Sequence, residues 1–161
     1  MVKRLRVYVD TSVLGGCFDP EFAPWSLGLI EDFRRGSFIP VLSEVTAAEV
    51  VAAPRSVRDL HAELLVEGAD LVAVDEEVLS LAAAYEARGI LSSRYRSDML
   101  HLAVATVAQA DVLVSWNFRH IVRLDRIRLF NAVNIEAGYR ELAIYSPREV
   151  TVYGSGADAG S

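Results

Sequence analysis

Short apolar runs alternate with segments of helical periodicity along most of this chain. Strand-like runs are predicted at residues 5–9, 38–42, 71–74, 112–114 and 142–145. Between them, the spacing of apolar residues and the capping and stop signals predict helices at residues 25–33, 44–53, 56–67, 76–88 and 98–109. Strands that alternate with helices form a parallel sheet with helices on both faces. We therefore expect an α/β fold, a three-layer α/β/α sandwich around a central, mostly parallel sheet of about five strands.

The length and composition fit one domain. The 161 residues, 52% of them hydrophobic, suffice for a sizeable core, and we expect a single domain over residues 1–150. The Gly- and Ser-rich end, residues 151–161, is expected to be disordered. No apolar run approaches the roughly 18 residues of a membrane helix, and the first one is too short for a secretory signal. The sequence thus predicts a soluble, cytoplasmic protein with no membrane partner.

The balance of charge limits the classes of nucleic acid that the chain could bind. A formal net charge of -6 argues against a protein that holds duplex DNA on a broad basic face. Lys and Arg nevertheless gather locally, at residues 3–6, 34–35, 94–96 and 119–128. Such clusters usually lie on solvated faces, although any one of them could contact phosphate. Binding to another kind of nucleic acid therefore stays open.

Polar side chains follow two of the predicted strands. Asp10 comes directly after the run at residues 5–9, and Asn117 lies just beyond the run at residues 112–114. Ligands of open α/β sheets bind at the carboxyl ends of the strands, so both residues are candidates for a functional site. Each also has a structural interpretation, Asp10 as an acid at a helix N-terminus and Asn117 as a turn or cap residue.

Glu49 lies within a predicted helix and is surrounded by a mainly apolar stripe. Val45 and Ala53, four residues to either side, lie on its face of the helix. A carboxylate turned towards a core needs a cation, an Arg partner or a raised pKa to compensate for its burial. Glu44 points elsewhere on the helix and is interpreted as an acid that complements the helix dipole.

Asp98 opens the apolar helix predicted at residues 98–109, with Ser97 as the expected N-cap. In the structural interpretation, Asp98 caps the helix or complements its dipole. In the functional interpretation, it belongs to a site at the carboxyl end of the sheet. His101 follows one turn later and is interpreted as a hydrogen-bonded core histidine rather than a metal ligand. Arg119 and His120 either contact phosphate or face solvent.

Four sequence blocks together resemble PIN-domain nucleases, especially the VapC-like toxins of prokaryotic toxin-antitoxin systems. The resemblance covers about residues 5–147. Its blocks are Val7-Tyr8-Val9-Asp10-Thr11-Ser12, residues 43–49 (SEVTAAE), residues 98–103 (DMLHLA) and residues 113–118 (LVSWNF). Each block is weakly specific alone, and their order and spacing make the resemblance more specific.

The resemblance implies a set of site residues. It places Asp10, Glu49 and Asp98 at the family's acidic metal-binding positions, where they would hold Mg²⁺ or Mn²⁺. Ser115 matches a frequent small hydroxyl residue. Asn117 departs from the pattern, since many members carry a fourth aspartate there. Asn117 is therefore a candidate catalytic residue that would orient water. Together with Thr11, Ser115 and Arg119, it is expected to contact the substrate or the ligands of the metal.

The function implied by the resemblance is metal-dependent hydrolysis of RNA phosphodiester bonds, with a cognate antitoxin and a homodimer as expected partners. One alternative is a catalytically weak PIN-like module that binds RNA or an antitoxin, because Asn117 brings no charge and the chain is acidic. Another is a haloacid-dehalogenase type phosphatase. Those enzymes need a second aspartate two residues after the first, where this chain has Ser12.

Overall fold

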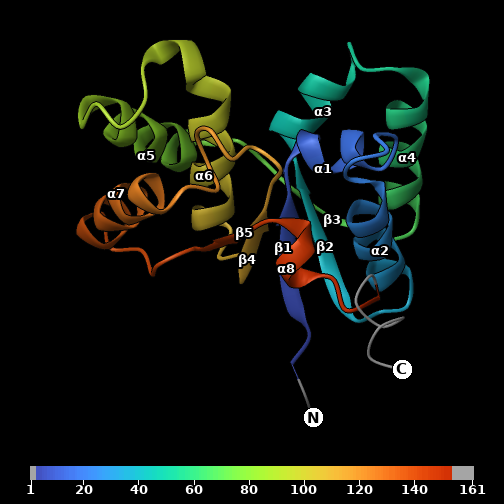
Figure 1. Ribbon diagram of the computed structural model, residues 1–161. Helices are drawn as coiled ribbons and strands as arrows, with labels where there is room; N and C mark the ends of the chain where they lie inside the picture. The colour runs from blue at the N-terminus through green and yellow to red at the C-terminus, as the bar shows by residue number, and fades with distance from the viewer. Residues whose placement is uncertain (1–2, 154–161) are drawn as a thin grey trace.

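The computed structural model describes residues 3–153 and contains a central sheet of five parallel strands (Figure 1). The strand order is β3-β2-β1-β4-β5. The strands are β1 (Leu5–Val9), β2 (Phe38–Ser43), β3 (Asp70–Val72), β4 (Val112–Val114) and β5 (Ala143–Tyr145). The predicted α/β class and the parallel five-stranded sheet are confirmed.

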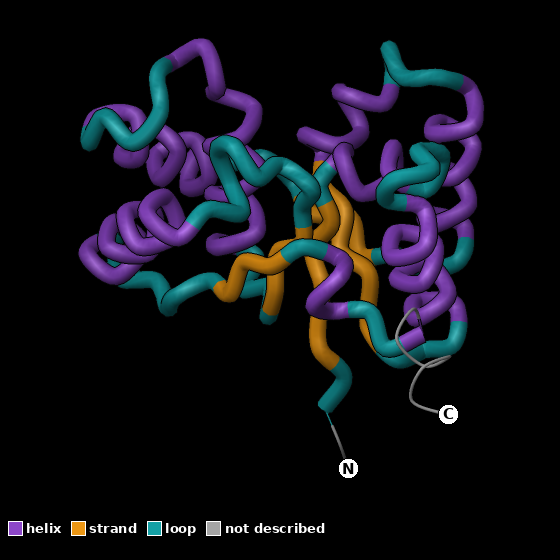
Figure 2. Tube along the Cα trace, in the orientation of Figure 1, coloured by secondary structure: helices purple, strands orange, loops and turns teal. Residues whose placement is uncertain are grey.

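Helices cover both faces of the sheet. They are α1 (Thr11–Gly16), α2 (Ala23–Arg34), α3 (Glu44–Val50), α4 (Arg55–Val66), α5 (Glu76–Ala87), α6 (Arg96–Val107), α7 (Leu124–Glu136) and α8 (Pro147–Val150). Helices α1 to α4 lie on one side of the strands and α5 to α7 on the other (Figures 1 and 2). A short 3₁₀ helix, Ser93–Tyr95, leads into α6.

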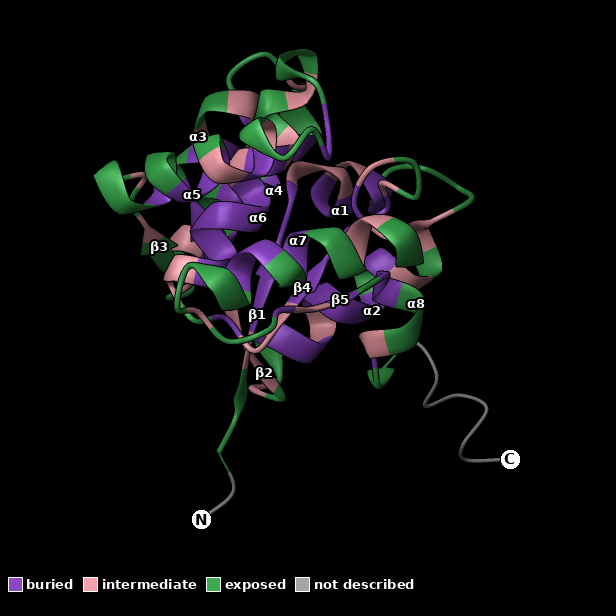
Figure 3. Cartoon of the chain, turned by 90° about the vertical axis from the view of Figure 1, so that its left-hand side faces the viewer, coloured by how far each residue is buried: buried purple, intermediate pink, exposed green. Residues whose placement is uncertain are grey.

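The central strand β1 shows why three layers form. Val7 and Val9 pack into a core shared with α1, α2 and α4, whereas Tyr8 packs into a second core shared with α5, α6 and α7. Successive side chains of a strand point to opposite faces, so a strand that is apolar on both faces must be covered twice. Figure 3 shows the result, with buried strands and a largely buried α6 behind helices whose outer faces are exposed.

The register of the sheet brings the ends of β1 and β4 together. Val9 pairs with Val114, and the backbone N–H of Asp10 donates to the carbonyl of Val114 at 3.3 Å. Parallel strands end at the same edge, so the first residues beyond each strand become neighbours. Asp10 therefore lies beside the segment that begins at Ser115.

Two predicted features differ from the structure. Ser97 is not the N-cap of α6, because the 3₁₀ turn leads into a helix that already begins at Arg96; Asp98 still lies in the first turn. No helix was predicted between residues 118 and 141, where Asn131, Asn134 and Gly138 are of types that favour turns and helix caps, but the structure has α7 there. Both asparagines are buried in that helix, and only Gly138, at φ 91°, follows its end.

The two ends of the described chain bear on other expectations. Within residues 3–153, no helix has the length and apolar character needed to cross a membrane. Of the tail expected to be disordered, Thr151 to Tyr153 are described and bind the buried carboxylate of Asp32. Residues 154–161 lie outside the described residues.

Candidate active site at the carboxyl end of the sheet

Asp10 is a buried carboxylate, 4% exposed, directly beyond β1. Its Oδ1 accepts a hydrogen bond from Ser12 Oγ and its Oδ2 accepts one from Ser115 Oγ, each at 2.5 Å. Burial raises the pKa of Asp10, and His101, Ser115 and Ser12 oppose that rise only in part. Among residues 3–153 no Lys, Arg or His forms an ion pair with it. A bound cation would supply the missing positive charge.

Glu49 is connected to Asp10 by Thr11, which follows Asp10 in the chain and binds the Glu49 carboxylate. The hydroxyl of Thr11 donates to Glu49 Oε1 at 2.6 Å, and His101 Nε2 lies 2.5 Å from the same oxygen. Burial favours the neutral form of Glu49, but hydrogen bonds and charge from His101, with bonds from Thr11 and Ser97, outweigh it and lower the pKa. The compensation expected for a carboxylate on this helix face therefore includes a histidine.

A buried chain of hydrogen bonds holds that histidine. His101 Nδ1 lies 2.6 Å from the Tyr8 hydroxyl, which lies 2.7 Å from Ser43 Oγ. Ser43 Oγ already accepts from the backbone N–H of Val45, so its own hydrogen is available to Tyr8. Burial raises the pKa of Tyr8, which keeps its hydroxyl protonated, so that the hydroxyl can donate to His101 when Nδ1 is unprotonated and to Ser43 when His101 is charged. His101 is thus a hydrogen-bonded core histidine as predicted, but it contacts the candidate ligand Glu49 rather than Asp98.

Asp98 and Asn117 meet through His120. Asp98 Oδ2 lies 3.0 Å from His120 Nδ1, and the His120 ring packs against Tyr95 with centroids 4.0 Å apart. Asn117 Oδ1 accepts from the backbone N–H groups of Arg119 and His120 at 3.2 and 2.9 Å. Asn117 therefore caps the turn that carries His120 to Asp98, which is the structural interpretation of this asparagine. No local sequence pattern predicts the contact of His120 with Asp98, because the two residues lie in separate segments.

The same contacts link Asp98 to Asp10. The backbone N–H of Asn117 donates to Ser115 Oγ at 2.9 Å, and Ser115 in turn donates to Asp10. The structure thus brings Asp10 and Asn117 together where the strands end, as the strand-end pattern predicts, and it places Glu49 and Asp98 around them, as the family resemblance implies. Within residues 3–153, however, no group of three or more His, Cys, Asp or Glu side chains is close enough to hold a metal ion. The carboxylates lie against hydroxyls and histidines instead of converging.

The chemistry of these donors nevertheless fits a hard divalent cation. Three carboxylates and a nearby carboxamide are the oxygen ligands that Mg²⁺ and Mn²⁺ prefer, and the buried Asp10 is the group that most needs a positive charge. The metal role of Asp10, Glu49 and Asp98 stays a prediction.

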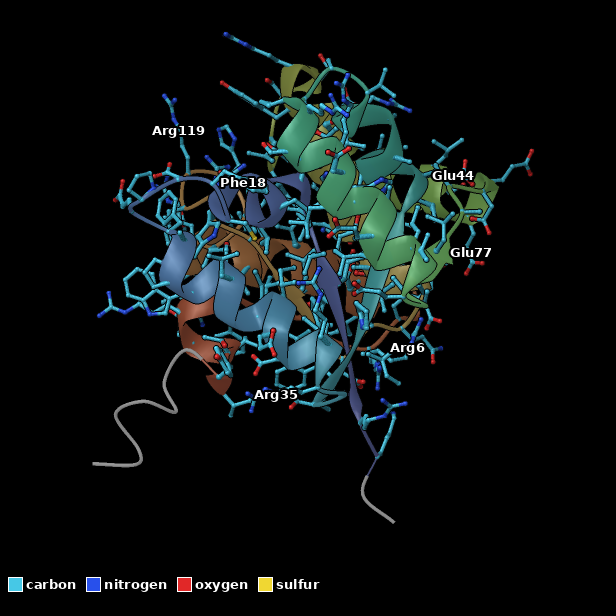
Figure 4. The ribbon with its side chains drawn as sticks, turned by 90° about the vertical axis from the view of Figure 1, so that its right-hand side faces the viewer. Arg6, Phe18, Arg35, Glu44, Glu77 and Arg119 are labelled. Atoms are coloured by element: carbon cyan, nitrogen blue, oxygen red, sulfur yellow. The ribbon has the colours of Figure 1, made fainter. Side chains whose placement is uncertain are left out.

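The basic clusters are distributed unequally around this site. Arg6 and Arg35 lie at the opposite end of the sheet from Arg119, which extends away from the ribbon (Figure 4). Arg6 pairs with Asp70, and Arg34 pairs with Glu63 and Glu67. No acidic partner of Arg119 is found in the described part of the chain. Arg119 is therefore the better placed of these arginines to bind a phosphate at the site.

Fold and site together define an α/β protein with acidic side chains gathered where its parallel strands end. The sequence model of the PIN domain family matches residues 7–127, and the chain belongs to this family. PIN domains are typically metal-dependent nucleases. The resemblance found in the four sequence blocks is confirmed at the level of the family.

Solved structures show the same fold. FitAcB from Neisseria gonorrhoeae has 18% sequence identity and a TM-score of 0.57, with 89% of this chain and 99% of that chain covered. VapBC2 from Rickettsia felis, bound to a DNA fragment from their promoter, has 11% identity and a TM-score of 0.54, with 87% and 97% covered. A search of curated proteins found no significant match.

Proposed function

We propose that this protein is a cytoplasmic, metal-dependent endoribonuclease that hydrolyses RNA phosphodiester bonds and acts as the VapC-like toxin of a toxin-antitoxin pair. The observation that carries the proposal is Asp10, a buried carboxylate without an ion pair in the described chain, at the strand end of a PIN domain. Glu49 is hydrogen-bonded to Thr11, the residue next to Asp10 in the chain, and three hydrogen bonds through Asn117 and His120 connect Ser115 to Asp98. RNA as the substrate is supported by the resemblance of the four sequence blocks to VapC-like nucleases.

In this proposal Asp10, Glu49 and Asp98 would hold Mg²⁺ or Mn²⁺. The ion would lower the pKa of a bound water and offset charge on the scissile phosphate. The surrounding residues orient the three carboxylates: Ser12 and Ser115 bind Asp10, Thr11 and His101 bind Glu49, and His120 binds Asp98. Arg119 would bind a neighbouring phosphate, and Asn117 would keep the 117–120 turn in place.

The proposed partners are a cognate antitoxin and a second copy of the chain. An antitoxin would cover the acidic end of the sheet and block access of RNA. The homodimer would use apolar helical surface, for which exposed side chains on α7 are candidates, among them Leu124, Leu129 and Ile135.

The experiment that tests the proposal replaces Asp98 with Asn. We expect Asp98→Asn to reduce Mn²⁺-dependent cleavage of RNA at least about 100-fold, because a ligand charge is lost, while the fold is retained. A matched control is Asp125→Asn, an exposed first-turn aspartate of α7 paired with Arg123. Circular dichroism checks the fold of both variants. Undiminished cleavage by Asp98→Asn would rule out its role in the reaction.

One observation favours a second candidate function, a catalytically weak module that binds RNA or an antitoxin. Asn117 Oδ1 is engaged by two backbone amides and the side chain brings no charge, so it does not replace a fourth metal-binding aspartate. Saturable RNA binding with Mn²⁺ but without turnover, over diverse RNA sequences, would support this module over the nuclease.

A further inference from the structure

We propose that the protein binds a nucleobase of its RNA substrate in an aromatic cavity beside the candidate active site. The inference rests on the proposed function, since it names a substrate subsite of the same active site. The cavity has a volume of about 350 Å³, and its walls include Phe22, Trp25, Trp116, Phe118 and Arg148. This set is called the aromatic cavity below.

The aromatic cavity is connected to Asp10 by direct contacts. Trp116 follows Ser115, whose hydroxyl donates to Asp10. The backbone N–H of Trp116 donates to Ser12 Oγ at 2.9 Å, and Ser12 donates to the other oxygen of Asp10. The two hydroxyls that orient the buried carboxylate therefore also position one wall of the cavity. A base bound there would belong to a nucleotide close to the scissile phosphate.

The rings provide a fixed wall and an open mouth. Trp116 stacks on Phe22 with centroids 4.3 Å apart and an interplanar angle of 25°, and its Nε1 donates to Ser26 Oγ at 2.8 Å. Trp25 and Phe118 meet Trp116 edge-on, at 6.2 and 6.1 Å. Trp116 is buried, whereas Phe118 is 50% exposed. A rigid indole with an exposed ring beside it is the arrangement on which a planar base can stack.

Charged groups at the same cavity favour a base over an apolar protein side chain. The Arg148 guanidinium lies 5.2 Å from the centre of the Trp25 ring, and the Arg148 side chain is exposed. Glu21 and Glu149 contribute carboxylates to the lining. A nucleobase carries a π-face for the rings and hydrogen-bond donors and acceptors on its edge for these charges. Glu149 already accepts hydrogen bonds from Ser146, whereas the exposed Arg148 and Glu21 can bind the polar edge of a base, for which an aliphatic side chain offers no group.

Tryptophan fluorescence reports on this cavity directly, because the chain has two tryptophans and both line it. We would titrate the full-length protein in chelator with AMP, GMP, CMP and UMP, and with ribose 5-phosphate, which lacks the base. We expect a saturable change with at least one nucleotide and none with ribose 5-phosphate. Phe118→Ala should weaken nucleotide binding by about 5- to 100-fold. Phe18→Ala is the matched control, since Phe18 is 51% exposed and outside the lining, and should bind as the unchanged protein does.

Several results would overturn the proposal: no saturable change with any nucleotide, an equal change with ribose 5-phosphate, or unchanged binding by Phe118→Ala. A response to N-acetyl-leucinamide but to no nucleotide would indicate a peptide site instead. The assay needs no metal and no cleavage. Cleavage of RNA without a fluorescence response to nucleotides would contradict nucleobase binding in the cavity but agree with the nuclease. A response to nucleotides without cleavage of RNA would contradict the nuclease but agree with binding in the cavity.

Discussion

At the scale of single residues, Asp10 couples the stability of the protein to pH and to metal. Burial raises its pKa in the folded protein above the ordinary value that the unfolded chain retains. Between these two values the folded state binds more protons than the unfolded state, so the stability contributed by this residue falls as pH rises through that window. Without metal, Asp10 therefore contributes least to stability at pH values above this window, and a bound cation, which favours the ionised carboxylate, would offset the penalty.

The variant Asp10→Asn tests this coupling. In chelator at neutral pH we expect it to unfold at a higher temperature than the unchanged protein, because an amide does not titrate and avoids the penalty that the raised pKa of Asp10 implies. The serine hydroxyls can reorient around the amide. Each kcal/mol of relief would raise Tm by about 2–4 °C. Added Mn²⁺ should raise Tm of the unchanged protein but not of the variant, as followed by differential scanning calorimetry. Equal stabilisation of both proteins by Mn²⁺ would contradict a metal role for Asp10.

Single residues also show how far the site could be predicted. The strand-end position of Asp10 and the apolar helix face around Glu49 are local patterns, and both residues lie at the predicted end of the sheet. The contacts of His101 with Glu49 and of His120 with Asp98 join residues 52 and 22 positions apart. Such pairs depend on how helices and loops pack, so no spacing within one segment indicates them.

At the scale of secondary structure elements, two consecutive glycines of α1 provide a matched test of packing against the aromatic cavity. A Cβ on Gly16 would lie 2.6 Å from both Ser26 Oγ and Trp116 Nε1, whereas a Cβ on Gly15 would have no atom within 4 Å. We expect Gly16→Ala to destabilise the protein by about 1–3 kcal/mol and to change its tryptophan fluorescence. Gly15→Ala should be neutral or stabilise by up to about 1 kcal/mol, since alanine favours a helix. Urea denaturation measures both, and equal losses would contradict the close approach of Gly16.

Helix α7 shows why one element was missed. Asn131 and Asn134 read as turn residues in a short window, yet both are buried in the helix. Asn131 Nδ2 donates to the carbonyl of Leu142 at 3.0 Å, and its Oδ1 accepts from the Leu142 N–H at 2.7 Å. The asparagine thus serves as the hydrogen-bonding partner of the segment entering β5. Asn131 is polar because it binds a distant segment of the chain, and turn propensity, which depends on neighbouring residues alone, does not predict such a contact.

At the scale of the whole molecule, the parallel sheet explains why scattered motifs could be assembled from sequence. All strands end at one edge, so polar residues after β1 and β4 become neighbours without any detailed knowledge of packing. The orientation of the carboxylates towards hydroxyls and histidines was not predictable in this way. The aromatic cavity was not either, because its walls come from three segments, around residues 21–25, 116–118 and 146–149.

The last described residues, 151–153, bind back to helix α2. The carboxylate of Asp32 in α2 accepts hydrogen bonds from Thr151, Val152 and Tyr153, just beyond α8. Helix α8 packs on α2, and these two helices carry Arg148 and Trp25 of the aromatic cavity. The end of the described chain therefore helps to hold the cavity walls at their observed separation.

The most direct test of metal-dependent ribonuclease activity is the initial rate of strand cleavage with matched RNA and DNA of one sequence. Purified protein would be assayed with Mn²⁺ or Mg²⁺ and again with excess chelator. We predict that the RNA strand is cleaved only when the metal is present and that the DNA strand stays intact. Cleavage that persists in chelator, or saturable binding of RNA without any metal-dependent cleavage, would contradict the assignment.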